Sequence, residues 1–334
     1  MSDPSILKLP ELIRHFFCQR LCAERHLSSA TVASYRDSFC LLLDFAAKQT
    51  ERQHSQLQLE DLGAPLVLKF LDHLETQRGN TVRTRNARLA AIQTFMRYVA
   101  QQEPTALVLS TRVLAIPNKR FDRPLLGYLS HSEMQSLLDA PDRNTWTGWR
   151  DAMLWELLYQ TGGRVSEIVA LNRQDVQFGE VNLVQLHGKG RKQRPVVLHQ
   201  GTATRLKQWL EELATDPLTP LFTNHGGKRL SRFGVIQRLR VSVQKALSTC
   251  PSLQGRKISP HTFRHTTAMH MLQSGVDFAS IALWLGHESM NTTHQYVEAD
   301  LEMKKKTLAK LEAPKGKASH YKASQDTLEF LRSL

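Results

Sequence analysis

The sequence has few cysteines and no long apolar run. Its four cysteines lack a second Cys or His pair at zinc-like spacing and are too scattered for a disulfide framework: Cys18, Cys22, Cys40 and Cys250. No apolar segment reaches membrane-spanning length, and the opening MSDPSILKLPELIRHFF has no basic stretch followed by an apolar one. We therefore expect a soluble cytoplasmic protein with reduced thiols and no membrane partner.

Acidic residues are scarce beside basic ones. Lys and Arg number 44 against 31 Asp and Glu, which gives a net charge of +13. This excess favours a polyanion such as duplex DNA or RNA as partner over a small acidic metabolite, although a basic surface without a specific partner is the alternative. A length of 334 residues and a hydrophobic fraction of 41% predict a globular protein of two domains.

The first part of the chain has helical periodicity throughout. Apolar residues recur at helical spacing in SSATVASYRDSFCLLLDFAAKQ, in APLVLKFLDHLETQ and in TVRTRNARLAAIQTFMRYVAQQ, with Ser28 or Ser29 as the first N-cap. A helical bundle is expected over residues 1–115. The segment AIPNKRFDRPLLGY follows, with two prolines and no apolar period, and predicts a linker over residues 116–128.

The second part changes period once. Ser130 and Glu133 form a capping-box pattern, and the apolar helix RDAMLWELLYQTG follows. In EVNLVQLHGKGRKQRPVVLHQ two β-rich runs flank a Gly-Lys-Gly-Arg-Lys turn, which predicts a β-hairpin. We expect a mainly α fold with a small antiparallel β-sheet, in which residues 129–312 form the second domain and 313–334 a tail with a short helix.

Three segments carry residues suited to phosphate chemistry. In ISPHTFRHTTAMHML, Ser259 is a good N-cap and Pro260 suits the first helical position, which places His261, Arg264 and His265 on one face. A solvated basic face is the plainer interpretation, and a zinc site lacks the glutamate of HExxH and a third ligand. In YQTGGRVSEIVAL, Arg164 follows two glycines, and Glu167 either orients Arg164 or caps the helix.

The hairpin and a late tyrosine complete a candidate set. The tip of the hairpin carries four basic residues, Lys189, Arg191, Lys192 and Arg194. Such a tip is either simply exposed to solvent or enters a groove of DNA. Tyr296 stands in LGHESMNTTHQYVEAD. Arginines stabilise phosphate charge, histidine moves protons near neutral pH, and a tyrosine beside cations and a base becomes a nucleophile. Such a set can attack a phosphodiester without a metal.

Taken in order, these segments resemble the tyrosine recombinase (phage integrase) family. TGGRVSEI is similar to its TGxRVSEL pattern, HGKGRKQR to GKGxKxR, HTFRH to HxLRH, LGHES to its LGH box and TTHQY to TTxxY. The resemblance implies six catalytic residues: Arg164, Lys189, His261, Arg264, His287 and the nucleophile Tyr296. Phe263 and Gly163 depart from the usual residues, and Lys192 competes with Lys189 for the hairpin role.

The resemblance implies a site-specific recombinase that cleaves and rejoins DNA through a 3′-phosphotyrosyl bond and a Holliday junction. It implies that the reaction needs no metal, no ATP and no cofactor. It also implies a tetramer assembled on two double-stranded DNA sites, made of this chain alone or together with a related recombinase, and a location at the nucleoid. Both a Xer-like resolvase and a mobile-element integrase fit, and the basic tail favours the latter. Topoisomerase-like relaxation and a DNA-binding homologue without catalysis remain as alternatives.

The resemblance also implies that both domains clamp DNA, the N-terminal one as a SAM-like core-binding domain. Candidate contacts are Arg83, Arg85, Arg88, Arg191, Lys192, Lys228, Arg229 and Arg232, each of which could equally be plain basic surface. The closing segment DTLEFLRSL is expected to dock on a neighbouring protomer or on its own domain.

Overall fold

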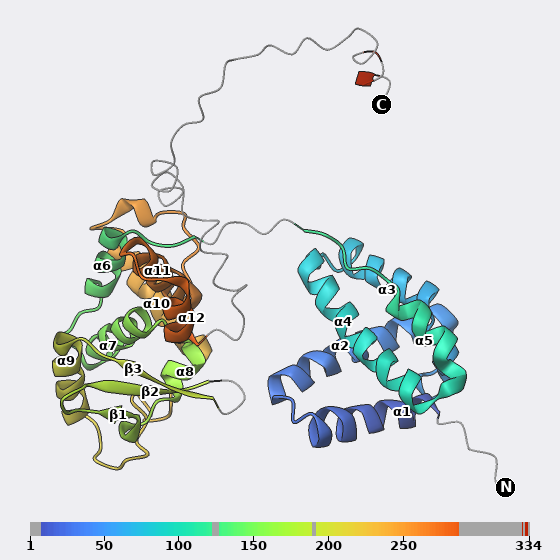
Figure 1. Ribbon diagram of the computed structural model, residues 1–334, viewed down its shortest axis with the longest axis horizontal. Helices are drawn as coiled ribbons and strands as arrows, with labels where there is room; N and C mark the ends of the chain where they lie inside the picture. Colours follow the sequence, from blue (N-terminus) through green and yellow to red (C-terminus); the bar gives the residue numbers. More distant parts are fainter. Residues whose placement is uncertain (1–7, 122–126, 189–191, 287–328, 330, 333–334) are drawn as a thin grey trace. The chain divides into compact units, whose positions relative to one another are not determined.

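The computed structural model describes residues 8–121, 127–188 and 192–286, together with 329, 331 and 332 (Figure 1). Its contacts divide the chain into two compact units, Met1–Arg123 and Pro124–Leu334. The division falls within the segment 116–128 that the sequence marks as a linker. Each unit is described by itself.

The N-terminal unit is all helical where it is described. Its main helices begin where the sequence offers an N-cap: the hydroxyl of Ser28 accepts from Thr31 N, and that of Thr81 accepts from Thr84 N, both at 3.3 Å. Phe16, Phe39 and Phe95 meet edge to face or tilted at the centre of the core. The elements are α1 (Leu9–His15), the π-helix η1 (Phe16–Glu24), α2 (Ser29–Thr50), η2 (His54–Gln56), η3 (Leu59–Leu62), α3 (Ala64–Thr76), α4 (Val82–Gln102), η4 (Pro104–Ala106) and α5 (Leu107–Leu114).

The segment after α5 is fastened to α4. Arg85 Nη1 donates to the carbonyl of Pro117 at 3.1 Å. The Asn86 side chain donates to the carbonyl of Lys119 at 2.8 Å and accepts from its N–H at 3.1 Å. The start of the linker segment is therefore held against the first unit by side chains of α4.

In the second unit a small sheet lies beside a group of helices (Figure 1). The capping box is confirmed, since Glu133 N donates to Ser130 Oγ at 3.2 Å and Ser130 N to Glu133 Oε2 at 2.8 Å. The elements are α6 (His131–Asp139), α7 (Trp146–Thr161), α8 (Val165–Ala170), η5 (Arg173–Asp175), β1 (Val176–Gln177), β2 (Leu183–His187), β3 (Gln193–Val197), α9 (Gln200–Glu211), α10 (Arg232–Ala246), η7 (Pro251–Leu253), α11 (Pro260–Gln273) and α12 (Phe278–Leu285).

The predicted hairpin is confirmed. Strands β2 and β3 pair antiparallel with Leu186 opposite Arg194, and Gly188 N donates to Lys192 O at 2.7 Å, which closes the ladder before the turn. A short strand, β1, extends the sheet in the order β1-β2-β3. The predicted fold class, mainly α with a small antiparallel sheet, is therefore confirmed.

Helix α7 forms the centre of the second unit. It is buried on nearly every side, and its buried residues include the ion-paired Arg150 and Asp151 as well as a long apolar run from Ala152 to Trp155. Trp155 is fully buried, packs on Phe263 of α11 at 5.7 Å between ring centroids and donates to the hydroxyl of Ser242 at 3.0 Å. Because α7 ends directly before Arg164, this rigid core sets the position of the candidate site.

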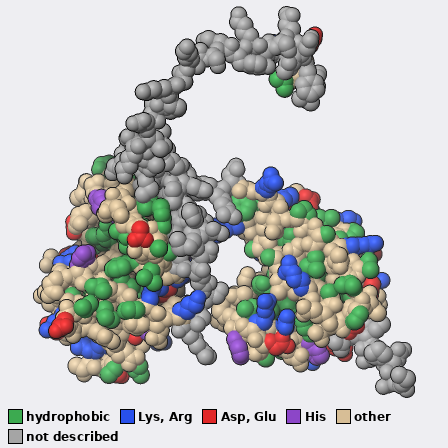
Figure 2. All heavy atoms as spheres, viewed as in Figure 1, with side chains coloured by type: hydrophobic (Ala, Val, Ile, Leu, Met, Phe, Trp, Pro, Cys, Tyr) green, Lys and Arg blue, Asp and Glu red, His purple; other side chains and the backbone are tan. Residues whose placement is uncertain are grey.

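Basic side chains lie on the surface of both units. Figure 2 shows Lys and Arg side chains on the visible face of each unit. Arg83, Lys228 and Arg232 are among those exposed. Over the part of the chain that the structure describes, no helix is both long and apolar enough to cross a bilayer.

Candidate active site

The turn between α7 and α8 presents Arg164. Gly162 ends α7 with a φ of +58°, a conformation in which a Cβ atom would be strained and would also collide with the side chain of Leu285. Arg164 then serves as the N-cap residue of α8, and 36% of its side chain stays exposed. The two glycines thus allow the sharp turn that leaves the guanidinium of Arg164 at the surface.

Glu167 both caps α8 and orients Arg164. Its Oε2 accepts from Arg164 N at 2.9 Å, and its Oε1 accepts from Arg164 Nη1 at 2.7 Å. Arg194 Nη2, from β3, donates to Oε2 at 2.8 Å. Burial alone would raise the pKa of Glu167, but the hydrogen bonds from Arg194 and Arg164 outweigh it and lower the pKa. The two roles that the sequence left open are therefore filled together by one ionised carboxylate.

Helix α11 brings the second arginine to the same turn. Ser259 is its N-cap residue and Pro260 its first residue, as predicted. Arg264 is only 5% exposed, and its Nη1 donates to the carbonyl of Gly162 at 2.8 Å. Arg264 and Arg164 are thereby brought together, although a hundred residues separate them in sequence.

Two histidines of α11 flank Arg264. Partial burial of the ring, followed by the charges of Arg232, Arg264 and Arg164, lowers the pKa of His261. Burial, then His261 and Arg264, lowers the pKa of His265 to about 4. Both rings are therefore neutral at pH 7, the state in which an imidazole can accept a proton. His261 is exposed and His265 half-buried.

Four predicted site residues lie outside the described residues: Lys189, Arg191, His287 and Tyr296. Lys189, Arg191 and His287 each have a described residue directly beside them in sequence. Gly188 ends the ladder before Lys189, and a Cβ atom there would lie 3.5 Å from Glu167 Oε1. Gly286, with a φ of +65°, ends α12 directly before His287. Lys192 is exposed at the start of the returning strand.

The predicted DNA contacts of α4 differ in orientation. Arg83 is exposed. Arg85 is 4% exposed, and its Nη1 donates to Pro117 O and Asn86 Oδ1, so it holds the segment after α5 rather than facing solvent. Arg88 is half-buried, and burial, then the charge of Arg78, lowers its pKa. Of the three, Arg83 is the one best placed to meet a phosphate.

The basic segment before α10 is similarly divided. Arg229 donates to the carbonyls of Val169 and Leu171 at 2.7 and 3.2 Å and to Asn172 Oδ1 at 2.6 Å, so it fastens its segment to the end of α8. Lys228 and Arg232 are exposed. Arg232 is also close enough to His261 to lower its pKa. Arg232 therefore borders the candidate site.

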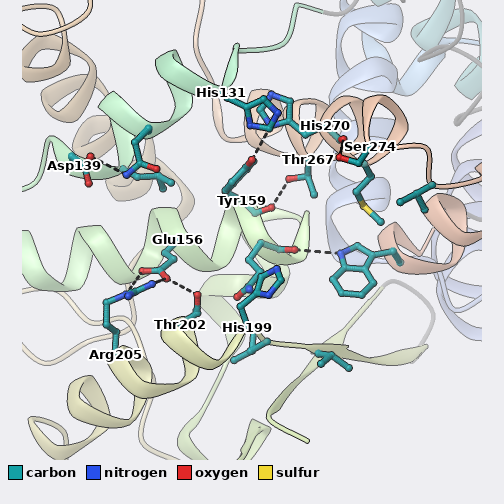
Figure 3. A pocket seen from close by; sticks show the side chains of 18 of the residues that line it. His131, Asp139, Glu156, Tyr159, His199, Thr202, Arg205, Thr267, His270 and Ser274 are labelled. Atoms are coloured by element: carbon teal, nitrogen blue, oxygen red, sulfur yellow. Dashed lines mark hydrogen bonds and ion pairs between the residues drawn. The ribbon is translucent and has the colours of Figure 1, made fainter. Parts of the chain in front are cut away.

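A second group of titratable side chains lines a cavity of about 1060 Å³ (Figure 3). His270 of α11 stacks on His131 at 3.7 Å between ring centroids and lies 2.9 Å from the carbonyl of Leu129. Since that carbonyl only accepts, His270 carries its proton on Nε2, and Nδ1 accepts from the Tyr159 hydroxyl at 2.7 Å. Burial, then His131, lowers the pKa of His270 to about 4.

The sequence of the chain matches two family patterns. Residues 127–303 match the Phage integrase family, and residues 15–103 match the Phage integrase N-terminal SAM-like domain. The chain belongs to the phage integrase family. The resemblance drawn from the motifs is thereby confirmed, and so is the prediction that the chain is a tyrosine site-specific recombinase, an enzyme of DNA recombination.

Named relatives of this phage integrase family member cover nearly its whole length. A Sinorhizobium fredii protein named as an integrase/recombinase, y4rC, is 45% identical over 326 residues, 98% of each chain. Tyrosine recombinase XerC of Chlamydia caviae is 33% identical over 303 residues, 89% of this chain and 91% of that protein. The site-specific recombinase XerH, in a post-cleavage complex with its palindromic difH substrate, shares the fold with a TM-score of 0.66 at 20% identity, over 86% of this chain and 81% of XerH.

Sequence reasoning missed one residue that the structure brings into the site. Arg194 was expected on the tip of the hairpin. Instead it lies within β3, its side chain 14% exposed, and bonds to Glu167. Side chains alternate between the two faces of a strand, so the position of Arg194 between Gln193 and Pro195 is the signal that could have predicted its inward orientation. The catalytic roles of the six predicted residues stay predictions.

Proposed function

We propose that this recombinase cleaves and rejoins DNA through a covalent 3′-phosphotyrosyl intermediate on Tyr296. The observation that carries the proposal is the meeting of two arginine-bearing segments, since Arg264 donates to Gly162 O two residues before Arg164. Two guanidinium groups that converge on one surface can hold the non-bridging oxygens of a phosphodiester and offset the charge of its transition state.

The cleavage step balances without a cofactor. The phenol oxygen of Tyr296 attacks the scissile phosphorus, and its proton passes to His261, whose lowered pKa keeps the ring neutral at pH 7. The bond from phosphorus to the 5′ oxygen breaks, and Lys189 donates a proton to that leaving oxygen. His287 donates a hydrogen bond to the phosphate. None of these steps demands a metal ion or ATP, because the phosphotyrosyl bond keeps the energy needed for rejoining.

Rejoining by a partner strand converts cleavage into recombination. A 5′-hydroxyl from a second DNA site attacks the phosphotyrosine, and two such exchanges pass through a Holliday junction. This requires four protomers on two double-stranded sites, alone or with a related recombinase, as the family resemblance implies. The chain would then act at the nucleoid, in the cytoplasm.

Both units contribute to DNA binding in this proposal. Residues 1–115 would form the core-binding domain and residues 129–312 the catalytic domain, joined by 116–128. Arg83, Lys228 and Arg232 are exposed and are proposed as phosphate contacts. Arg191 and Lys192, next to each other in the hairpin sequence, are proposed as groove contacts.

The test is a trapping assay with wild type and Tyr296→Phe. Nicked duplexes drawn from DNA that flanks the gene are incubated with chelator present, and products are resolved on a denaturing gel. The wild type is expected to give an SDS-resistant adduct at a 3′ phosphate, and the variant none, because phenylalanine has no nucleophile. An adduct that persists in the variant would contradict the assignment of Tyr296.

The same proteins separate recombination from the alternatives. Supercoiled plasmids with one or two copies of the trapped site are incubated with wild type. Products of strand exchange that need two sites support a recombinase, whereas relaxation of a one-site plasmid supports topoisomerase-like activity. DNA binding without any adduct would indicate a binding protein.

A further inference from the structure

Arg194 lies where three segments of the candidate site meet. It is a residue of β3, one side of the hairpin that carries Lys189 and Lys192. Its Nη2 donates to Glu167 Oε2 at 2.8 Å, and its Nε donates to the carbonyl of Trp284, the last residue but one of α12, at 3.2 Å. A single guanidinium therefore joins the sheet to α8 and to α12.

The packing around Arg194 leaves its guanidinium little freedom. Only 14% of the side chain is exposed, and 3% of its partner Glu167. A Cβ atom at Gly286 would lie 2.9 Å from Arg194 Nη1 and 3.1 Å from its Cδ, so the backbone of this glycine rests directly on the arginine. Gly286 is followed in sequence by His287. The position of Arg194 is thus fixed by contacts on both sides.

The bonds of Glu167 form a relay between two arginines. Glu167 Oε2 accepts hydrogen bonds from Arg194 Nη2 and from the main-chain N–H of Arg164. Glu167 Oε1 accepts from Nη1 of the Arg164 side chain. Without Arg194, the buried carboxylate would have Arg164 as its remaining cationic partner in the described residues. The guanidinium of Arg164 would then turn further toward Glu167, away from any phosphate, to satisfy that charge.

We propose that Arg194 is a positioning residue for the cleavage reaction, which acts through Glu167 to hold the guanidinium of Arg164 toward the scissile phosphate. This inference rests on the proposed function. Arg194 itself touches no reacting atom in the proposal. It differs from a plain structural ion pair because its partner carboxylate also holds the side chain of Arg164, two residues from the carbonyl of Gly162 that Arg264 binds.

The test measures the single-turnover rate of adduct formation on the trapped duplex. Arg194→Ala is expected to slow the rate about 30-fold, since a displaced positioning group costs on the order of 10- to 100-fold, while the Kd for the duplex stays within about threefold. Arg194→Lys keeps the charge but cannot reach both Glu167 and Trp284 O. It is expected to recover most of the rate, to within about fivefold of wild type.

A mutant cycle with Glu167→Gln tests the route. If Arg194 acts through Glu167, the double variant is no slower than the slower single variant. Arg205→Ala is the matched control, because Arg205 of α9 pairs with the buried Glu156 in the same unit (Figure 3) and, among the described residues, bonds neither to Glu167 nor to either arginine of the site. This variant loses a comparable ion pair, and we expect it to form adducts at the wild-type rate at temperatures well below its Tm.

The outcomes separate the two proposals. A wild type that forms adducts, with Arg194→Ala at the same rate, would overturn the role of Arg194 and leave the proposed function intact. Losses that multiply in the double variant, or an equal loss in Arg205→Ala, would also overturn it. A wild type without adduct on every flanking duplex would contradict the proposed function and, with it, this role of Arg194.

Discussion

Helix α11 of this recombinase carries two long-range contacts that look alike and serve different ends. At its first turns Arg264 donates to the carbonyl of Gly162, and near its end His270 donates to the carbonyl of Leu129. Each is a buried side chain, 5% exposed, that bonds a main-chain oxygen far away in sequence. The first contact lies two residues before the half-buried Arg164, whereas the second borders a cavity lined by Tyr159 and His131.

Two buried glutamates repeat this contrast. Glu167 binds donors from α8 and β3, whereas Glu156 binds Thr202 and Arg205, both from α9. Hydrogen bonds overcome burial and lower the pKa of both. The lesson is that burial and ionisation do not distinguish a site from a scaffold. What distinguishes them is which segments the carboxylate joins: Glu167 holds Arg164, next to the turn that Arg264 also binds, whereas both side-chain donors to Glu156 come from the single helix α9.

The largest expected effect compares Arg264→Ala with His270→Ala. Loss of Arg264 removes the proposed phosphate clamp and the anchor of Gly162, so adduct formation should fall by on the order of 10³-fold, as for other losses of transition-state charge stabilisation. Loss of His270 should cost about 1–3 kcal/mol of unfolding free energy through unmade buried hydrogen bonds, with little change in rate. Single-turnover trapping and urea unfolding measure the two. Comparable rate losses would erase the distinction.

A smaller effect is expected when the two glutamates are neutralised. Glu167→Gln should slow adduct formation on the order of 10- to 100-fold, because Arg164 and Arg194 lose the carboxylate that orients them. Glu156→Gln should leave the rate within about twofold and lower the Tm instead. The same trapping assay, beside thermal unfolding, checks both. An intact rate in Glu167→Gln would show that Arg164 needs no carboxylate to orient it.

The contrast between these regions also explains what the sequence could predict. The Ser130–Glu133 cap and the Arg164–Glu167 pair are bonds between residues three apart, so helical geometry alone dictates them. The motifs identified Arg164, His261 and Arg264 as candidates. The inward turn of Arg194 toward a residue 27 positions away, and the fastening of Arg229 to Val169 60 positions away, depend on tertiary packing. The sequence offered Arg85 as a candidate DNA contact or plain basic surface, because a local pattern cannot show that Arg85 binds the carbonyl of Pro117.

The smallest expected effect compares the titration of two histidines of α11. Arg232 contributes to the lowered pKa of His261, whereas burial and His131 lower the pKa of His270. Arg232→Ala should therefore raise the pKa of His261 and leave that of His270 at about 4. NMR titration of the DNA-free protein, with labelled histidine rings, measures both.

The sign of the pH effect follows from these directions. A proposed base at position 261 accepts a proton only when neutral, so the cleavage rate should fall as pH drops through its pKa, and Arg232→Ala should move that fall to higher pH. His270 acts on stability instead: its folded pKa lies below the ordinary value near 6.5, so its contribution is fully present above that value and is lost as pH falls toward 4. If Arg232→Ala instead changed the pH at which stability is lost, and left the pH dependence of the cleavage rate unchanged, Arg232 would be a structural residue. The candidate site would then include His261 but not Arg232.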